Sequence, residues 1–157
     1  MDKASFSREK RMKEYKHTQI GYLLIAAFGA AILLLGYLNV ITRFNPGTIL
    51  LLVLMILCLA LFATLTIQVN DQAIKIQFGI GVIRKRFALR DIQAYRLAKN
   101  PWYYGWGIHL TPDGWLFNVS GSESVELQMK NGRKYRIGTD DAQGFMIAMD
   151  SSLKSTQ

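Results

Sequence analysis

The sequence contains a single cysteine, Cys58, which excludes a disulfide within the chain and a metal site built from several cysteines. Histidine is also scarce, because the chain has only His17 and His109. These two residues are far apart, and neither has a carboxylate or a cysteine at the spacing of a metal-ligand set. A protein metal site needs three or four converging ligands. The sequence therefore predicts no metal site, and we expect no cofactor.

The motifs of common catalytic and phosphate-binding sites are missing as well. Gly79-Ile-Gly81 lacks the third glycine and the following helix of a glycine-rich phosphate loop. No set of Ser, His and Asp residues indicates a catalytic triad. We therefore expect that the protein is not an enzyme. The formal net charge is +8, but no nucleic-acid-binding signature accompanies it, so we expect no nucleic-acid partner.

Charge is absent from two long apolar runs, Ile20–Ile41 and Thr48–Ile67, which contain no Asp, Glu, Lys, Arg or His. A helix rises 1.5 Å per residue, so about 20 apolar residues cross the hydrocarbon core of a bilayer. Only Thr42–Gly47 separates the runs, and its Asn-Pro-Gly sequence favours a turn. The sequence predicts a two-span transmembrane α-hairpin over residues 20–67. Without an ionisable residue in either span, a transporter subunit is disfavoured.

The distribution of Lys and Arg predicts the orientation of this hairpin. Residues 1–19 form a basic segment with six Lys or Arg residues, whereas the hairpin loop has only Arg43. Many more basic residues follow the second run, beginning with Lys75. Positive charge is retained on the cytoplasmic side, so both termini should be cytoplasmic and the loop should face outward. The expected location is the cytoplasmic membrane.

Alternating polar and apolar residues indicate strands after the second run. The alternation begins in Thr64–Val69, so we expect helix to give way to strand near Thr64 and the following domain to lie against the membrane. We assign residues 68–157 to this domain. Further strands are expected at Ala73–Phe78, Ile83–Leu89, Ile92–Ala98, Trp106–Leu110, Trp115–Val119, Ser124–Met129 and Lys134–Ile137.

The apolar pattern also predicts the pairing of the first two of these strands. Phe78 should face Ile83, Ile74 should face Phe87, and Lys75 should face Arg86, because a slip of one residue would mix arginines with the apolar face. This register leaves Lys85 on the apolar face, as an edge strand or a snorkelling side chain would allow.

Two further signals complete the predicted fold. Asn131-Gly132 is typical of a two-residue type I′ hairpin turn. Thr139 can cap a final helix in which Phe145, Met149 and Leu153 recur at helical spacing. We therefore predict an all-β sandwich or open barrel, closed at one end by a C-terminal helix.

Several motifs resemble those of bacterial membrane proteins with a pleckstrin-homology-like (PH-like) domain. They are Ile76–Gly79, Phe87–Ile92, Asn100–Gly107, Gly114–Gly121, Gly132–Arg136 and Ile137–Thr139. The resemblance implies a PH-like barrel capped by its C-terminal helix, in a bacterial cytoplasmic membrane. It implies little about activity. Phosphoinositide-binding PH domains use basic residues around the first strand pair, but Val69–Gln72 has no Lys or Arg, so this ligand is not carried over.

Basic residues form the first candidate site, which consists of Lys75, Arg84, Arg86 and Arg90. One interpretation is contact with anionic lipid headgroups, worth about 1 kcal/mol per basic residue near the surface. The other is an ordinary solvated face whose charge only retains the domain in the cytoplasm.

Aromatic residues form the second candidate site, which consists of Trp102, Tyr103, Tyr104 and Trp106. Trp and Tyr favour both membrane interfaces and protein-binding surfaces. The competing interpretation is a loop and strand that contribute aromatic side chains to the core.

These observations favour a non-catalytic, membrane-anchored interaction or scaffold module that binds a protein partner or its own copies at the cytoplasmic face. Membrane lipids are the expected surroundings of the hairpin. The alternative function is binding of anionic lipid headgroups by Arg84, Arg86 and Arg90.

Overall fold

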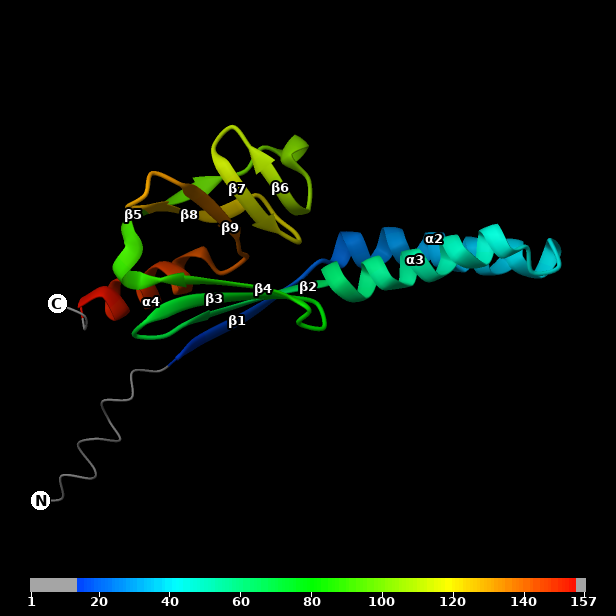
Figure 1. Ribbon diagram of the computed structural model, residues 1–157, viewed down its shortest axis with the longest axis horizontal. Helices are drawn as coiled ribbons and strands as arrows, with labels where there is room; N and C mark the ends of the chain where they lie inside the picture. The colour runs from blue at the N-terminus through cyan, green and yellow to red at the C-terminus, as the bar shows by residue number, and fades with distance from the viewer. Residues whose placement is uncertain (1–13, 155–157) are drawn as a thin grey trace, which may run out of the picture.

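The computed structural model describes residues 14–154, in which two long antiparallel helices project from a β-rich domain (Figure 1). The domain contains two sheets and a C-terminal helix. The chain enters the domain in strand β1 (Tyr15–Ile20), leaves it through α2 (Tyr22–Ile41) and returns through α3 (Pro46–Phe62). The order of helices, strands and final helix agrees with the coarse architecture expected from the sequence.

The turn between α2 and α3 is fixed by polar side chains. Asn45 caps α3, because its Oδ1 accepts a hydrogen bond of 2.8 Å from the backbone N–H of Gly47. Pro46 occupies the first turn of α3, where a backbone N–H would have no helical partner. The hydroxyl of Thr48 donates to Oδ1 of Asn39 at 2.8 Å and thereby joins the two helices.

The two helices differ in length. α2 has 20 residues and is long and apolar enough to cross a membrane, whereas α3 is a shorter apolar helix of 17 residues. The predicted second span therefore ends too late. It was expected to reach Ile67, but the helix ends at Phe62 and a strand begins at Thr64. The expected change from helix to strand near Thr64 is confirmed.

Strand β1 was not predicted and changes the connectivity of the molecule. It lies within the segment 1–19 that was expected to be only a basic terminal segment, and it also includes Ile20, which was assigned to the first span. β1 pairs antiparallel with β2 (Thr64–Val69), from Ile20 opposite Thr64 to Tyr15 opposite Val69. The helices α2 and α3 are therefore an insertion between two paired strands.

The first sheet has four antiparallel strands in the order β1-β2-β3-β4, with β3 at Ala73–Phe78 and β4 at Ile83–Ala88. The predicted register is confirmed, with Lys75 opposite Arg86. The position of Lys85 also has a physical cause. β4 is an edge strand, and the ammonium of Lys85 lies 5.3 Å from the centre of the Tyr135 ring.

The second sheet has five strands in the order β5-β8-β9-β7-β6, and all its pairs are antiparallel except β7 with β9. The short helix η1 (Leu89–Asp91) connects the two sheets. Every strand predicted after residue 72 is present to within one residue at each end. The strands are β5 Ile92–Lys99, β6 Gly107–Thr111, β7 Gly114–Asn118, β8 Glu123–Met129 and β9 Lys134–Gly138.

The C-terminal helix α4 (Ala142–Lys154) contacts both sheets and buries Phe145 and Met149. Its cap is not the predicted Thr139. The Oδ1 atom of Asp141 accepts a hydrogen bond of 2.9 Å from the N–H of Gly144, which is the geometry of an N-cap. The hydroxyl of Thr139 instead accepts from the N–H of Asp141 and shapes the preceding turn.

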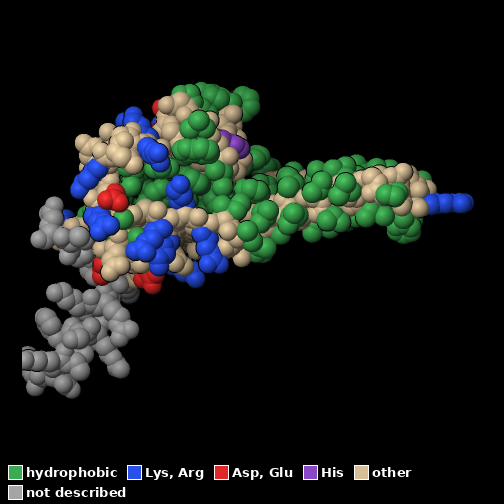
Figure 2. All heavy atoms as spheres, in the orientation of Figure 1, with side chains coloured by type: hydrophobic (Ala, Val, Ile, Leu, Met, Phe, Trp, Pro, Cys, Tyr) green, Lys and Arg blue, Asp and Glu red, His purple; other side chains and the backbone are tan. Residues whose placement is uncertain are grey.

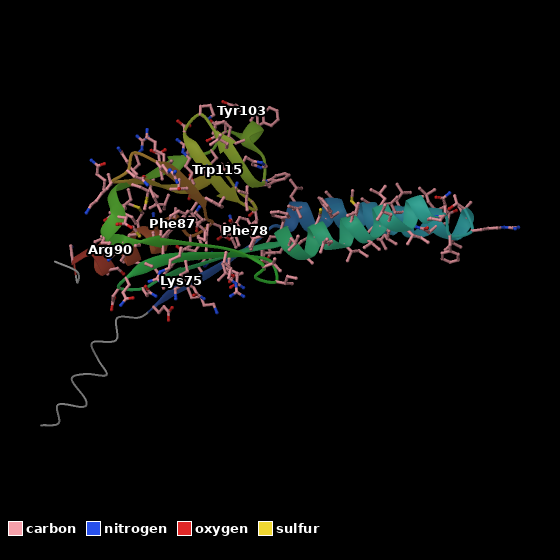
Figure 3. The ribbon with its side chains drawn as sticks, in the orientation of Figure 1. Lys75, Phe78, Phe87, Arg90, Tyr103 and Trp115 are labelled. Carbon is pink, nitrogen blue, oxygen red and sulfur yellow. The ribbon has the colours of Figure 1, made fainter. Side chains whose placement is uncertain are left out.

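The core lies between the sheets and contains aromatic side chains from both. Phe78 and Phe87 of the first sheet pack around Phe117 of the second, and Phe87 also contacts the ring of Tyr135. Figure 3 shows Phe78 and Phe87 pointing into this interior. Because the apolar side chains of the first sheet are used here, its opposite face is left to polar residues.

Candidate functional site

The outer face of the four-stranded sheet carries exposed basic side chains from three of its strands. Lys75 and Arg86 are exposed and lie directly opposite each other on β3 and β4. Gln68 is paired with Lys75 from β2, and Lys16 is paired with Gln68 from β1. One row across the sheet therefore reads Lys16, Gln68, Lys75 and Arg86.

Arg84 belongs to the neighbouring row on the same face. It lies opposite Gln77, which in turn lies opposite Thr66. Its Nε donates a hydrogen bond to the backbone oxygen of Gly81, so the turn between β3 and β4 holds the start of the side chain. The two rows line an open groove of about 430 Å³ that includes Lys75, Arg84 and Arg86.

No acidic side chain balances these cations within the sheet. The strands β1, β2, β3 and β4 contain no Asp or Glu. Like charges directly opposite each other in a sheet repel. Lys75 and Arg86 therefore form a position that an anionic group would stabilise. We call the exposed Lys16, Lys75, Arg84 and Arg86 the basic face, and Figure 2 shows Lys and Arg gathered along the lower side of the domain.

Arg90 does not belong to this face. It lies on η1, after the end of β4, and its Nε is 3.9 Å from Oδ1 of Asp91. Figure 3 places Arg90 at the end of the domain away from the helices, with Lys75 between. The structure thus brings together Lys75, Arg84 and Arg86 on the sheet, whereas Arg90 lies beyond the end of β4 and lines a second open groove with Arg86.

The aromatic segment Trp102–Trp106 lies on the surface. Its first three residues form the short helix η2 (Trp102–Tyr104). Trp102 is 90 % exposed, Tyr103 is 68 % exposed and Trp106 is 41 % exposed. The interpretation that these residues fill the core is therefore wrong for all three, although Trp115, which belongs to the same aromatic-rich region, lines a groove between the sheets.

Tyr104 is the exception in this segment, because it connects η2 to the five-stranded sheet. Its hydroxyl donates a hydrogen bond of 3.1 Å to Oδ2 of Asp113, in the turn between β6 and β7. Loss of solvation and this hydrogen bond to a carboxylate raise the pKa of the Tyr104 phenol. The hydroxyl therefore stays a donor over the ordinary pH range.

Behind Tyr104 lies a buried ionic cluster that sequence reasoning missed. Arg136 donates to Asp113 at 3.0 Å and to Glu126 at 2.8 Å, and Arg96 reaches the other oxygen of Glu126 at 2.8 Å. Glu126 and Arg136 are almost completely buried. The cluster spans β5, β8, β9 and the β6–β7 turn, and through Tyr104 it holds the aromatic segment in place.

The cluster was missed because the turn between β8 and β9 is not the predicted type I′ turn. A two-residue turn at Asn131-Gly132 would place Glu126 opposite Ile137. The structure has a three-residue turn in which only Gly132 adopts a positive φ, of 82°, and the N–H of Gly132 donates to the oxygen of Met129. The shift by one residue places Glu126 opposite Arg136.

The two histidines have local partners. Nε2 of His17 lies 2.5 Å from Oδ1 of Asp140, and Nε2 of His109 contacts the backbone oxygen of Trp106. Over residues 14–154, no group of three or more His, Cys, Asp or Glu side chains is placed to hold a metal ion. The basic face itself presents cations and the amides of Gln68 and Gln77, which can bind anionic groups.

Comparison with known proteins gives no relative: no protein-family model, curated protein or solved structure matches the chain. The resemblance to membrane proteins with a PH-like domain therefore stays a prediction that rests on the sequence motifs. The function is argued below from the geometry of the described residues.

Proposed function

We propose that the protein is a non-catalytic, membrane-anchored interaction module whose β-rich domain binds a protein partner or a second copy at the cytoplasmic face. The observation that carries the proposal is the basic face, in which Lys75 lies opposite Arg86 without an acidic neighbour in the sheet. This face belongs to a domain that is joined by two paired strands to a pair of apolar helices.

The strand pairing supports a two-span hairpin. α2, at 20 residues, is about 30 Å long, which is enough to cross the hydrocarbon core. The start of α2 and the end of α3 are held next to each other, because Ile20 before α2 is paired with Thr64 after α3. A chain that leaves this sheet and crosses the membrane has to cross it again to return. If α2 spans the membrane, α3 therefore spans it too.

The strand order supports a PH-like domain of the type that the sequence motifs imply. Without the inserted helices, β1 to β4 form one antiparallel meander. Without the β6–β7 hairpin, β5, β8 and β9 form a second meander that is followed by α4. Seven strands closed by a C-terminal helix remain. The positive charge before α2 and after α3 supports a cytoplasmic position in a bacterial membrane.

A protein partner fits the basic face better than lipid headgroups do, because the cations lie at different heights. The strands continue from the helices, and each residue of a strand adds about 3.3 Å. Arg84 is level with Thr66, two residues from the start of β2, whereas Lys75 and Arg86 are level with Gln68, four residues from it. Four residues correspond to roughly 13 Å and two residues to about half of that, so a flat membrane surface does not reach the three cations equally.

Lipid headgroup binding by Arg84, Arg86 and Arg90 is the second candidate. It is supported by Arg84, whose position near the helices places it within reach of a membrane surface. Arg86 is level with Gln68, two residues further along β2 than the level of Arg84, and Arg90 lies at the opposite end of the domain (Figure 3). A surface that used all three residues would require the domain to lie on its side, which the double connection to the helices opposes.

Site-specific photo-crosslinking in native membranes tests the proposal. A photoreactive amino acid replaces Gln68, which lies between Lys16 and Lys75. We expect a discrete protein adduct that disappears in the charge-reversed variant Lys75→Glu/Arg86→Glu. An adduct at twice the mass of the chain identifies a second copy, and another discrete mass identifies a different protein.

The matched control reverses two exposed cations at the start of β9 and in the turn before it, Lys134→Glu and Arg133→Glu, and should keep the adduct. Adducts with lipid alone, or a protein adduct that survives reversal of Lys75 and Arg86, would contradict the proposal. Reconstitution into vesicles that contain anionic lipid distinguishes the two candidates. Headgroup binding predicts lipid adducts at position 68 that decrease with added salt and are lost in Lys75→Glu/Arg86→Glu, whereas protein binding predicts no such lipid adducts.

A further inference from the structure

Two loops at the end of the domain nearest the helices expose apolar side chains. The first is the turn Gly79–Val82 between β3 and β4, in which Ile80 is 67 % exposed and Val82 is 71 % exposed. The N–H of Ile80 donates a hydrogen bond of 3.2 Å to the backbone oxygen of Ala60 in the last turn of α3. This turn is therefore fastened to the side of a helix while its apolar side chains face outward.

The second loop is the aromatic segment on the other sheet. Trp106 and Ile108 line an apolar groove of about 410 Å³ whose opposite wall includes Leu24 and Phe28 of α2 and Phe62 of α3. Tyr103 lies at the same end of the domain (Figure 3), and Trp102 is its neighbour in η2. Neither Gly79–Val82 nor the stretch from Pro101 to Ile108 contains a charged residue.

Both loops overlap the helices along their length. Phe28 is six residues after the start of α2, which corresponds to about 9 Å of helix. Ala60 is two residues before the end of α3, which corresponds to about 3 Å. A bilayer whose apolar region begins where the helices leave the domain would therefore contact both loops.

The length of α3 also supports contact between these loops and the bilayer. Its 17 residues span about 26 Å, less than the ~30 Å of a typical hydrocarbon core. A short span is accommodated when the bilayer thins or when flanking residues enter the interface. Ile80 and Val82, attached beside the end of α3, are suited to that position because they have no charge or hydrogen-bonding group to desolvate.

We propose that the domain makes a second contact with the membrane, in which Ile80 and Val82 on one side of the helices and Trp102, Tyr103 and Trp106 on the other enter the boundary between headgroups and acyl chains. Trp and Tyr favour this boundary. Contacts on two sides of the hairpin resist tilting and keep the basic face at a defined angle to the bilayer. This inference rests on the proposed hairpin but not on partner binding.

Tryptophan fluorescence tests the inference, because the chain has three tryptophans and two of them lie in the segment. Trp115→Phe retains Trp102 and Trp106. Trp102→Phe/Trp106→Phe retains Trp115, which is 43 % exposed, close to the 41 % of Trp106. Trp115 is paired with Leu110, which lies four residues, or roughly 13 Å of extended chain, beyond Trp106.

Each full-length variant is reconstituted into phosphatidylcholine vesicles with acyl chains brominated near the carbonyl end, and into unbrominated vesicles. We expect a roughly twofold or larger loss of fluorescence for Trp115→Phe and little loss for Trp102→Phe/Trp106→Phe, as interfacial insertion of Trp102 and Trp106 requires. Equal quenching of the two variants, or none for Trp115→Phe, would overturn the inference.

The turn at Ile80 is tested separately in a Cys58→Ala background. An environment-sensitive fluorophore on Val82→Cys should shift to the blue on reconstitution, whereas the same fluorophore on Asn131→Cys should not; no shift at position 82 contradicts the inference. Vesicle flotation is measured on every sample. If the chain floats but the tryptophans are unquenched, only the second contact fails; if it does not float, the proposed hairpin fails as well.

Discussion

At the scale of single residues, Glu126 is the centre of the ionic cluster. Its two carboxylate oxygens bind Arg96 and Arg136, and both Glu126 and Arg136 are buried. A buried pair is weak evidence for stability by itself, but removal of one partner leaves the other charge without compensation. The cluster is therefore more important for the position of neighbouring groups, including Tyr104, than for the total stability.

We predict that Glu126→Gln lowers the free energy of unfolding by about 2 kcal/mol, because buried Arg136 then keeps only Asp113 as a charged partner. Denaturant unfolding of the full chain in detergent measures the change. The matched control is Arg96→Gln. The Arg96 side chain is 67 % exposed, so its loss should cost about 1 kcal/mol or less. Equal losses in the two variants would contradict a cluster whose buried part is the pair of Glu126 and Arg136.

Tyr95 provides a pH-dependent contribution at the same scale. Burial, together with the hydrogen bond from its hydroxyl to Asp150, raises the pKa of Tyr95 to about 12, compared with an ordinary value of about 10. The unfolded chain thus releases this proton first as the pH rises. The stabilisation is complete below about pH 10 and is lost progressively between about pH 10 and about pH 12.

We therefore predict that Tyr95→Phe removes part of the decrease in stability over this alkaline range. Unfolding of both proteins at several pH values measures the difference. A spectrophotometric titration supplies the control, because the tyrosinate signal that appears near pH 12 should be missing in the variant. Parallel stability curves for the two proteins would show that the Tyr95 hydroxyl does not contribute.

At the scale of elements, the turn between β3 and β4 connects the four-stranded sheet to α3. Gly79 has a φ of +44°, and a Cβ added there would lie 2.0 Å from the backbone oxygen of Ala60. The N–H of Gly79 also donates to the oxygen of Thr64 at 2.9 Å. Only glycine allows this close approach of the turn to the helix end.

We predict that Gly79→Ala destabilises the protein clearly more than Gly132→Ala does. Both substitutions place alanine at a positive φ, which costs roughly 1–2 kcal/mol. Gly132 has no atom within 4 Å of the added Cβ, so the difference between the variants isolates the contact between the turn and α3. Thermal unfolding of the two variants measures it. Equal effects would mean that the turn can move away from the helix without loss.

The strands after residue 72 could be predicted because each of them buries one apolar face against the core. β1 could not, because its inward side chains are polar. Tyr15 donates to Asp141, and Nε2 of Gln19 donates to the backbone oxygen of Ser120 at 2.7 Å. These partners come from loops more than a hundred residues away, so the alternation of polar and apolar residues around β1 does not predict them.

The candidate sites were predictable to different degrees. The register of β3 and β4 follows from local alternation, so the pairing of Lys75 with Arg86 could be predicted. Arg90 was grouped with them by nearness in the sequence, but η1 places it past the end of β4, where it lines a groove with Arg86 and not with Lys75. The pairing of Glu126 with Arg136 could not be predicted, because it requires a three-residue turn between β8 and β9 rather than the expected two-residue turn. The sequence Asn-Gly is compatible with more than one type of hairpin turn.

At the scale of the whole molecule, the insertion of α2 and α3 between the paired strands β1 and β2 fixes the orientation of the domain relative to the helices. β1 and β2 pair along six residues each, and the N–H of Gly21 donates to the oxygen of Ala63 at 2.8 Å, directly below the helices. The domain is therefore held by two strands rather than by one flexible linker. Its basic face keeps a fixed direction relative to the helix axis, which a module that presents a surface to a partner requires.

This connectivity makes the topology testable with few measurements. In a Cys58→Ala background, Phe44→Cys places a thiol in the turn between α2 and α3, and Lys130→Cys places one in the exposed β8–β9 turn. A membrane-impermeant maleimide added to intact cells should label position 44 and spare position 130. Lysis should make both reactive, which controls for the accessibility of Lys130→Cys.

The three other labelling patterns have distinct meanings. Labelling of position 130 alone would reverse the orientation, against the distribution of Lys and Arg. Labelling of both positions in intact cells would place the whole chain outside. Protection of both would mean that α2 and α3 do not cross the membrane. Because Ile20 and Thr64 are paired in one sheet, the start of α2 and the end of α3 lie on the same side of the membrane, which excludes a single crossing. Labelling of position 44 therefore shows whether both helices cross the membrane.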